Sequence, residues 1–151
     1  MRTRRGWAVL VGLGAVLLAL VLIGVRPQTD DGFRSAVETG VQDAVSSVGT
    51  ARLAGQTALR DGTFASYEST VLEDTRESVA TALSDLAELP VPGQDSQKLR
   101  DEVLPLLQES VRQIGDLGTG LAEDDRATAT EAVDGLAGTG EKLAAVLDGL
   151  R

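Results

Sequence analysis

The sequence contains two kinds of hydrophobic pattern, one after the other. Residues 7–25 hold no charged or strongly polar side chain. Beyond a short polar stretch, apolar or small residues recur at alternating spacings of four and three as far as Leu150. An unbroken apolar run is typical of a transmembrane helix. The alternating recurrence at four and three residues predicts amphipathic helices that share one core.

The apolar run, from Trp7 to Val25, is long enough to cross a membrane. At ~1.5 Å per residue it extends over ~28 Å, about the thickness of the hydrocarbon layer. A cleaved signal peptide is the alternative, but its apolar region normally has only ~7 to 15 residues and ends in a small-x-small site. No such site occurs in the segment Leu22-Ile23-Gly24-Val25-Arg26-Pro27. We therefore predict an uncleaved transmembrane helix at 7–25.

Basic residues predict the orientation of this helix. Arg2, Arg4 and Arg5 precede the span, and Arg26 alone follows it closely. The positive-inside rule therefore places residues 1–6 in the cytoplasm as a short stub. The chain beyond the span is then extracytoplasmic, attached to the cell membrane by a single pass and in contact with lipid through its anchor.

Small residues form a stripe along the predicted anchor. Ala8, Gly12, Ala15 and Ala19 are spaced four, three and four apart, so they share one face of a helix. Such a stripe lets two transmembrane helices approach closely, which would make the chain a homodimer. A chain rich in Ala and Gly also produces such stripes by chance, and both interpretations stay open.

After a polar linker at 26–32, residues 33–151 have the pattern of four helices. Asp61-Gly62-Thr63 predicts a tight turn after the first helix, and Pro90-Val91-Pro92-Gly93 ends the second. Asp95 or Ser96 is expected to cap the third helix, and the acidic turn Glu123-Asp124-Asp125 the fourth. The expected core positions are Val37, Val41, Ala44, Val48, Ala51, Gly55 and Ala58 in the first helix; Phe64, Val71, Leu72, Thr75, Val79, Ala82, Leu83, Leu86 and Leu89 in the second; Leu99, Val103, Leu106, Leu107, Ser110, Ile114, Leu117 and Leu121 in the third; and Ala129, Val133, Leu136, Gly140, Leu143, Leu147 and Leu150 in the fourth.

Four amphipathic segments of similar length, joined by short connections, are what an up-down bundle requires. The third contains Pro105, which is expected to kink it. The sequence therefore predicts an all-α fold, with an N-terminal transmembrane helix followed by an up-down four-helix bundle.

Charge is distributed unevenly. The whole chain has a formal net charge of −9. Because the first 26 residues carry four arginines and no acid, the remainder carries −13. A surface of that sign repels phosphates and anionic lipid headgroups, so nucleic acid is not an expected partner. It can attract a basic partner, although solubility is the simpler explanation.

The composition also limits the chemistry. The chain has no histidine and no cysteine, which excludes Ser-His-Asp and Cys-His catalysis, zinc sites with those ligands, and the Glu-x-x-His of di-metal bundles. Asp124 and Asp125 could hold calcium weakly, but helix capping explains them better. We predict no catalytic, cofactor-binding or metal-binding residues, no cofactor and no enzymatic activity.

Arg52, Arg60 and Tyr67 are the candidates for a ligand or partner contact. Arg52 lies beside the apolar face of the first helix, and a tight hairpin would bring it within reach of Glu68 or Glu73. It is either a half-buried cation in a binding site or one half of an interhelical ion pair with a packed aliphatic stem. The ion pair is the simpler interpretation.

The segment from Thr50 to Glu77, TARLAGQTALRDGTFASYESTVLEDTRE, is followed by a proline-bearing loop and two further helices. This arrangement resembles a group of uncharacterised, membrane-anchored helical proteins from actinobacteria. It is also similar in outline to the outer sensor domains of bacterial chemoreceptors. The first resemblance implies an anchored extracytoplasmic bundle and carries no biochemical activity.

Two functions remain as hypotheses. The first is a non-catalytic interaction module that binds another envelope or membrane protein. The alternative is a small-ligand-binding or sensor bundle that acts through a membrane partner, with its pocket near Arg52 and Tyr67. An exposed apolar surface would favour the first, and a buried cavity with converging polar groups the second.

Overall fold

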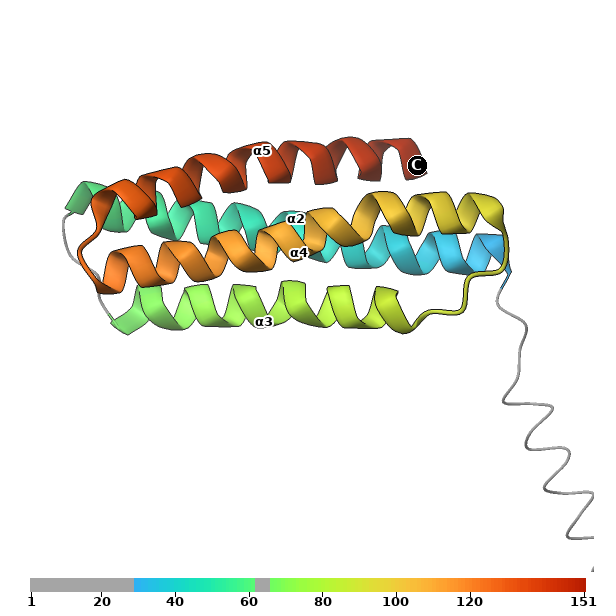
Figure 1. Ribbon diagram of the computed structural model, residues 1–151, viewed down its shortest axis with the longest axis horizontal. Coiled ribbons are helices and arrows are strands. Elements are labelled where there is room, and N and C mark those ends of the chain that lie inside the picture. The colour runs from blue at the N-terminus through green and yellow to red at the C-terminus, as the bar shows by residue number, and fades with distance from the viewer. Residues whose placement is uncertain (1–28, 62–65) are drawn as a thin grey trace, which may run out of the picture.

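The structure, a computed structural model, describes residues 29–61 and 66–151 of the chain. These residues form four α-helices: α2 (Asp30–Asp61), α3 (Ser66–Glu88), α4 (Gln94–Ala122) and α5 (Arg126–Leu150). Each helix runs opposite to the one before it (Figure 1). No strand occurs within the described ranges. The prediction of an all-α, up-down four-helix bundle is confirmed for this part of the chain.

The predicted anchor lies outside the described residues. This applies to the stub at 1–6, to the span at 7–25 and to its stripe Ala8, Gly12, Ala15 and Ala19. None of the four helices in the described part is both long and apolar enough to cross a membrane. The predicted turn residues Gly62 and Thr63 and the core residue Phe64 are likewise outside the described ranges.

The four helices are not arranged as a regular square. Consecutive helices pack together, α5 closes against α2, and α2 also contacts α4 across the bundle, whereas α3 and α5 do not meet. Small residues on α2 explain this diagonal contact. A Cβ atom added at Gly55 would lie 2.7 Å from Cδ2 of Leu117 and 2.9 Å from Cγ2 of Val133, so α4 and α5 approach α2 where it has no side chain.

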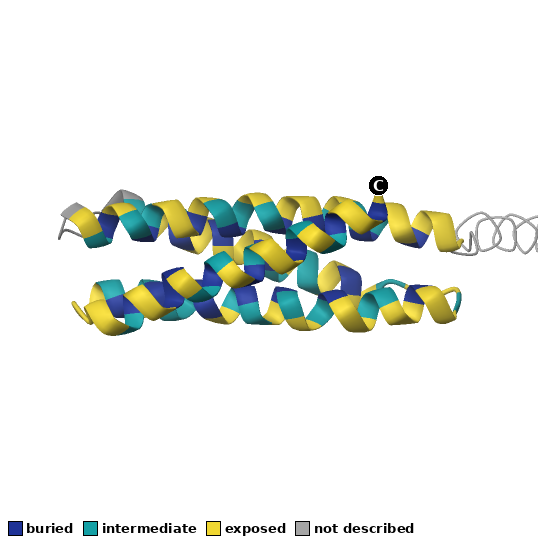
Figure 2. Ribbon diagram, turned by 90° about the horizontal axis from the view of Figure 1, so that it is seen from above, coloured by how far each residue is buried: buried dark blue, intermediate teal, exposed yellow. Residues whose placement is uncertain are grey.

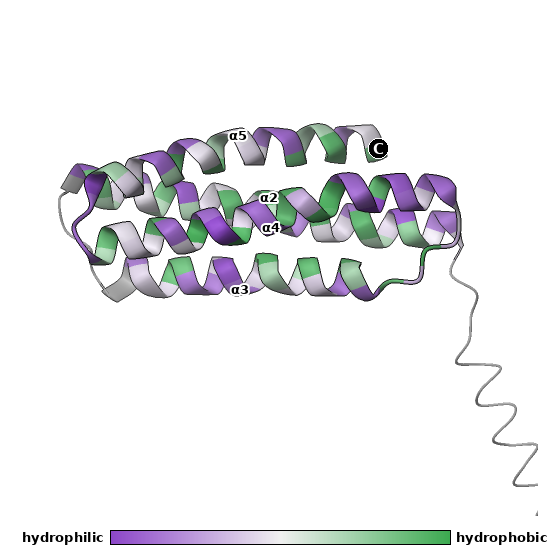
Figure 3. Cartoon of the chain, viewed as in Figure 1, coloured by the Kyte–Doolittle hydropathy of each residue, from purple (hydrophilic) through white to green (hydrophobic). Residues whose placement is uncertain are grey.

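The core follows the spacing of apolar residues in the sequence. All seven core positions expected on the first helix are buried, from Val37 to Ala58. On α5, every expected position is buried except Gly140, which is half-buried. Phe33 is fully buried and among the largest core side chains, although it falls at the edge of the predicted domain. Figure 2 shows the buried residues on the inward faces of the helices, and Figure 3 shows hydrophobic and hydrophilic residues alternating along each helix.

Two helix starts differ from the predictions. Helix α2 begins at Asp30, inside the predicted linker, because the Thr29 hydroxyl accepts a hydrogen bond from the Gly32 amide at 3.1 Å and so caps the helix. The cap predicted at Asp95 or Ser96 is wrong. Helix α4 begins after Gly93, which makes no side-chain cap, and the Ser96 hydroxyl donates instead to Asp30 at 2.7 Å.

The cap predicted for the last helix is confirmed. The Asp125 carboxylate accepts hydrogen bonds from the amides of Ala127 at 3.1 Å and Thr128 at 3.2 Å. Asp124, just before it, has a φ of 56°, a left-handed conformation that Asp tolerates better than most residues. The two acids therefore serve as the turn and the cap between α4 and α5.

Candidate functional site

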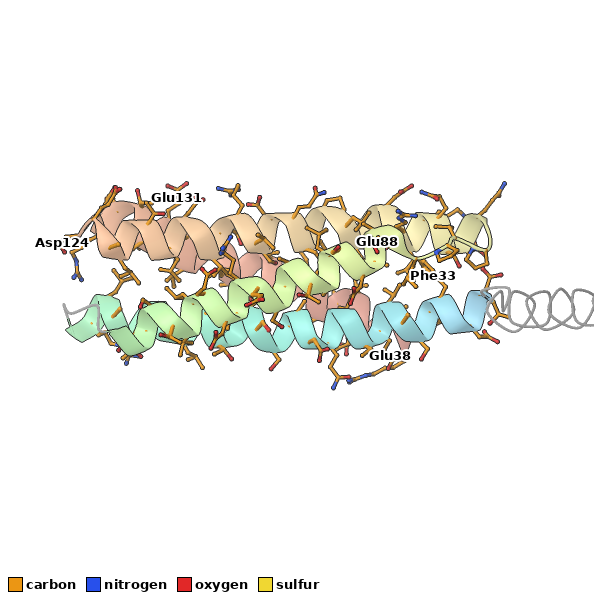
Figure 4. All side chains as sticks on the ribbon, turned by 90° about the horizontal axis from the view of Figure 1, so that it is seen from below. Phe33, Glu38, Glu88, Asp124 and Glu131 are labelled. Atoms are coloured by element: carbon orange, nitrogen blue, oxygen red, sulfur yellow. The ribbon has the colours of Figure 1, made fainter. Side chains whose placement is uncertain are left out.

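An open groove of about 920 Å³ lies between α2 and α3. Figure 4 shows α3 running obliquely, from beside α2 at its start towards α4 at its end. The groove follows the half of α3 that diverges from α2, up to Glu88, which is labelled in that view. We call this feature the acidic groove. Its lining residues are Ala36, Val37, Thr39, Gly40, Val41, Asp43, Asp74, Glu77, Ser78, Thr81, Ala82, Asp85, Leu86, Glu88, Leu89, Pro90, Val103 and Leu107.

The floor of the acidic groove is apolar. It lies over the core residues Val37 and Val41 from α2, Leu86 from α3, and Val103 and Leu107 from α4, each at most 5% exposed. The accessible surface of the floor comes from small or partly buried residues: Ala36 and Gly40 on α2, Ala82 on α3, and Leu89 and Pro90 just after it. Covering this accessible surface with a partner would be favourable, at roughly 25 cal/mol per Å² removed from water.

The rim of the acidic groove carries charge of a single sign. Its charged residues are Asp43 on α2 and Asp74, Glu77, Asp85 and Glu88 on α3, all exposed, and no lysine or arginine lines the groove. Acids on both walls of an apolar depression concentrate a negative potential there, because the low-dielectric walls focus the field. The groove therefore favours a cation and disfavours an anion.

Small side chains on the facing helices leave room for the groove. Ala36 and Gly40 on α2 face the part of α3 that contains Ser78 and Ala82. A Cβ atom at Gly40 would lie 3.9 Å from Cβ of Ala82, an ordinary contact distance. At the far end of the groove the Ser47 hydroxyl donates to the Ser78 hydroxyl at 3.0 Å and holds the two helices together.

A second depression of about 770 Å³ lies where α2 and α4 begin and α5 ends. Its lining is of mixed charge and includes Asp30, Arg34, Ser96 and Lys142. Several of these groups already have partners within the protein: Ser96 donates to Asp30, and Arg34 donates to the Leu150 carbonyl at 3.2 Å. This depression therefore offers a partner fewer unpaired side chains of a single charge than the acidic groove does.

The three candidate contact residues are not brought together. Arg52 is exposed and has no ion pair within the described ranges. Arg60 lies in the last turn of α2 and donates to the Gln56 carbonyl at 3.3 Å. Tyr67 belongs to the first turn of α3, and its side chain lies outside the described residues. Neither depression is lined by Arg52 or Arg60.

The expected ion pair between Arg52 and α3 is therefore wrong. Glu73 is bound instead by Arg76, three residues along the same helix, at 2.8 Å. The Oε2 atom of Glu68 is buried without a hydrogen-bond partner. Arg52 follows the core residue Ala51 directly, and adjacent residues on a helix point about 100° apart, so its side chain turns towards solvent.

The clear pKa shifts belong to surface pairs and to a helix cap. A hydrogen bond from Arg76 lowers the pKa of Glu73, and one from Arg112 lowers that of Glu109. Both pairs link residues three apart on one helix, a common feature of exposed helix faces. Within the described residues no group of three or more acidic side chains is placed to hold a metal ion.

Sequence reasoning missed the acidic groove, although part of its signal is visible. Asp74, Glu77, Asp85 and Glu88 share one face of α3 at helical spacing, a pattern that is also typical of a solvated helix face. What the spacing does not reveal is the depression beside these acids, because Ala36 and Gly40 on its other wall come from another helix.

Comparison of the chain with protein-family models, with curated proteins and with solved structures gives no match. No activity, ligand or partner is therefore carried over from a relative.

Proposed function

We propose that the chain is a membrane-anchored, extracytoplasmic interaction module without catalytic activity, which binds another envelope or membrane protein through the acidic groove. The observation that carries this proposal is an open groove whose accessible surface combines small apolar residues with rim acids of one sign. Among the described residues, Leu53 is the only large hydrophobic side chain that is exposed, at 63%, and it lies outside the groove.

The shape of the groove supports a macromolecular partner over a small molecule. Small-molecule sites usually enclose most of their ligand and place a few polar groups around it. The acidic groove is open along its length, and its polar groups are carboxylates at the edges. Such a surface fits a partner that lies along it.

The position of the groove fits a partner in the same membrane. If residues 7–25 span the bilayer, only residues 26–29 separate the span from α2, and four residues reach at most ~14 Å. Asp43 lies thirteen residues beyond Asp30, about 20 Å along the helix. The groove then lies close to the extracytoplasmic surface of the membrane that holds the anchor. The small-residue stripe from Ala8 to Ala19 would allow the same anchor to form a homodimer.

Site-specific photo-crosslinking in intact membranes tests the proposal. A photoreactive residue is introduced into the full chain at Thr39 or Thr81, which are exposed in the groove, or at Thr130, which is exposed on α5. We expect the two groove positions to capture the same protein, identified by mass spectrometry, and Thr130 not to capture it. No adduct from the groove, or the same adduct from all three positions, would contradict the proposal.

A further inference from the structure

We infer that the occupant of the acidic groove is a cationic amphipathic helix presented by a protein partner. This inference rests on the proposed function and adds the chemistry of the partner. Four features of the groove carry it: its length, its apolar floor, the sign of its rim, and the small residues along its walls.

The length of the groove matches a short helix. Its α3 wall extends from Asp74 to Glu88, which is about 21 Å at 1.5 Å per residue, or roughly four helical turns. A helix laid in a groove anchors itself through apolar residues at positions i, i+3 or i+4, and i+7. The accessible apolar surface of Ala36, Ala82 and Leu89 along the groove can receive such a stripe.

The walls allow a helix to come close. Ala36 and Gly40 on α2, with Ala82 on α3, present little or no side chain to the groove. Helices pack at the shortest distances where the side chains in contact are small. A ridge of leucine-sized residues on the partner can therefore pack against these small residues.

The rim selects for positive charge on the partner. Five exposed carboxylates border the groove, and no basic residue lines it. Arg76, a neighbour of Glu77 on α3, is already bound to Glu73. Lysines or arginines that flank the apolar stripe of the partner would meet carboxylates on both walls. Acidic helices, nucleic acids and anionic lipid surfaces would be repelled by the same groups.

Peptide binding to the full chain in zwitterionic detergent tests this inference. The probe is a labelled amphipathic peptide of about four turns, with a leucine stripe flanked by lysines, and its binding is followed by fluorescence anisotropy. A peptide of the same pattern with glutamate in place of lysine is the control. We expect only the cationic peptide to bind, and about 0.5 M salt to weaken its binding several-fold because the rim charges are exposed.

Two pairs of variants locate the binding. Neutralising the rim with Asp43→Asn, Asp74→Asn and Asp85→Asn should reduce the affinity for the peptide about tenfold. The effect is moderate because each exposed ion pair between a rim carboxylate and a peptide lysine contributes little to the binding free energy. The matched triple on α5, Asp134→Asn, Glu141→Gln and Asp148→Asn, removes the same charge from exposed positions outside the groove and should change affinity less than about twofold.

The second pair is steric. Gly40→Leu places a large side chain in the groove, whereas Gly49→Leu, on the same helix, adds one where nothing lies within 4 Å. Both changes favour helix formation, so both variants should fold, as circular dichroism will show. We expect only Gly40→Leu to abolish peptide binding.

Failure of this inference is distinguishable from failure of the proposed function. Absence of peptide binding, equal effects of the two charge triples, or equal effects of the two glycine variants would overturn the cationic-helix inference. If Thr39 and Thr81 still capture one protein in membranes, the proposed function stands and its partner has a different chemistry.

Discussion

Arg34 and Arg126 make reciprocal contacts at opposite ends of the α2 and α5 pair. Arg34, in the first turns of α2, donates to the carbonyls of Leu150 at 3.2 Å and Gly149 at 2.8 Å, where α5 ends. Arg126, at the start of α5, donates to the Leu59 carbonyl near the end of α2 at 2.6 Å. The last carbonyls of a helix lack partners within it and carry partial negative charge, so each guanidinium stabilises the end of the neighbouring helix.

We therefore predict that Arg34→Met loosens the end of α5 and Arg126→Met loosens the end of α2. Methionine keeps much of the aliphatic stem but cannot donate to the carbonyls. Hydrogen exchange measured by mass spectrometry should show a several-fold faster exchange confined to the last turns of the affected helix. Arg52→Met is the control, because Arg52 is exposed and unpaired in the described structure, and it should leave exchange unchanged. Faster exchange throughout the bundle would contradict a local role.

Gly55 should be intolerant of any side chain. An added Cβ would lie within 3.0 Å of the terminal methyl groups of Leu117 and Val133, so Gly55→Ala forces these side chains to shift within the packed core and should cost about 1–3 kcal/mol. Gly49→Ala, on the same helix with nothing within 4 Å, should instead stabilise by about 0.5–1 kcal/mol through helix propensity. Urea unfolding checks both. Equal changes in the two variants would mean that the diagonal contact between α2 and α4 is not close.

The cap of α5 predicts a specific response to acid. Hydrogen bonds from the Thr128 hydroxyl, the Thr128 amide and the Ala127 amide hold the pKa of Asp125 below its usual value. A depressed pKa contributes stability that is complete above the unfolded pKa, about 3.9, and is lost as the pH falls through the lower folded pKa. Below about pH 4, the protection factors against hydrogen exchange in the first turn of α5 should therefore fall.

Asp125→Asn is the control for this response, since asparagine caps a helix but does not titrate in this range. Its protection factors at the start of α5 should not fall below about pH 4. The same acid response in both proteins would exclude Asp125 as its source.

Leu136 tests the core. It is fully buried on α5, so Leu136→Asp places an unpaired charge there and should unfold the bundle or cost several kcal/mol. Leu53→Asp makes the same change at a side chain that is 63% exposed and should alter stability by no more than about 0.5 kcal/mol. Thermal unfolding followed by circular dichroism distinguishes them. A mild effect at Leu136 would mean that this face is not buried.

The helices and their inward faces could be predicted because they depend on local spacing. The four-three recurrence from Val37 to Ala58 gives the buried face of α2 directly, and the Asp125 cap follows from an acid before a helical run. The start of α2 was missed because Thr29 and the acids after it were interpreted as a linker. Acids in a first turn also favour a helix, through its dipole.

Contacts between distant residues could not be predicted in this way. The Ser96 hydroxyl bonds to Asp30, sixty-six residues away in the sequence, and no local pattern indicates that pairing. The acidic groove depends in the same way on the oblique course of α3, which diverges from α2 along its second half (Figure 4). Arg52 was predicted to pair across the hairpin, but Arg76 reaches Glu73 within one turn of the same helix.

Single-cysteine labelling tests the central claim, that a membrane-tethered bundle binds a partner through its acidic groove on the outer side of the membrane. The chain contains no cysteine, so Thr81→Cys in the groove and Thr130→Cys on α5 each give one defined thiol. With a membrane-impermeant maleimide, we predict that Thr130→Cys is labelled equally fast in intact cells and in purified protein, and that Thr81→Cys is labelled several-fold more slowly in cells. If neither thiol were labelled in intact cells, the bundle would not lie on the outer side of the membrane. If Thr81→Cys were labelled equally fast in cells and in purified protein, no partner would cover the groove. Either result would contradict the claim.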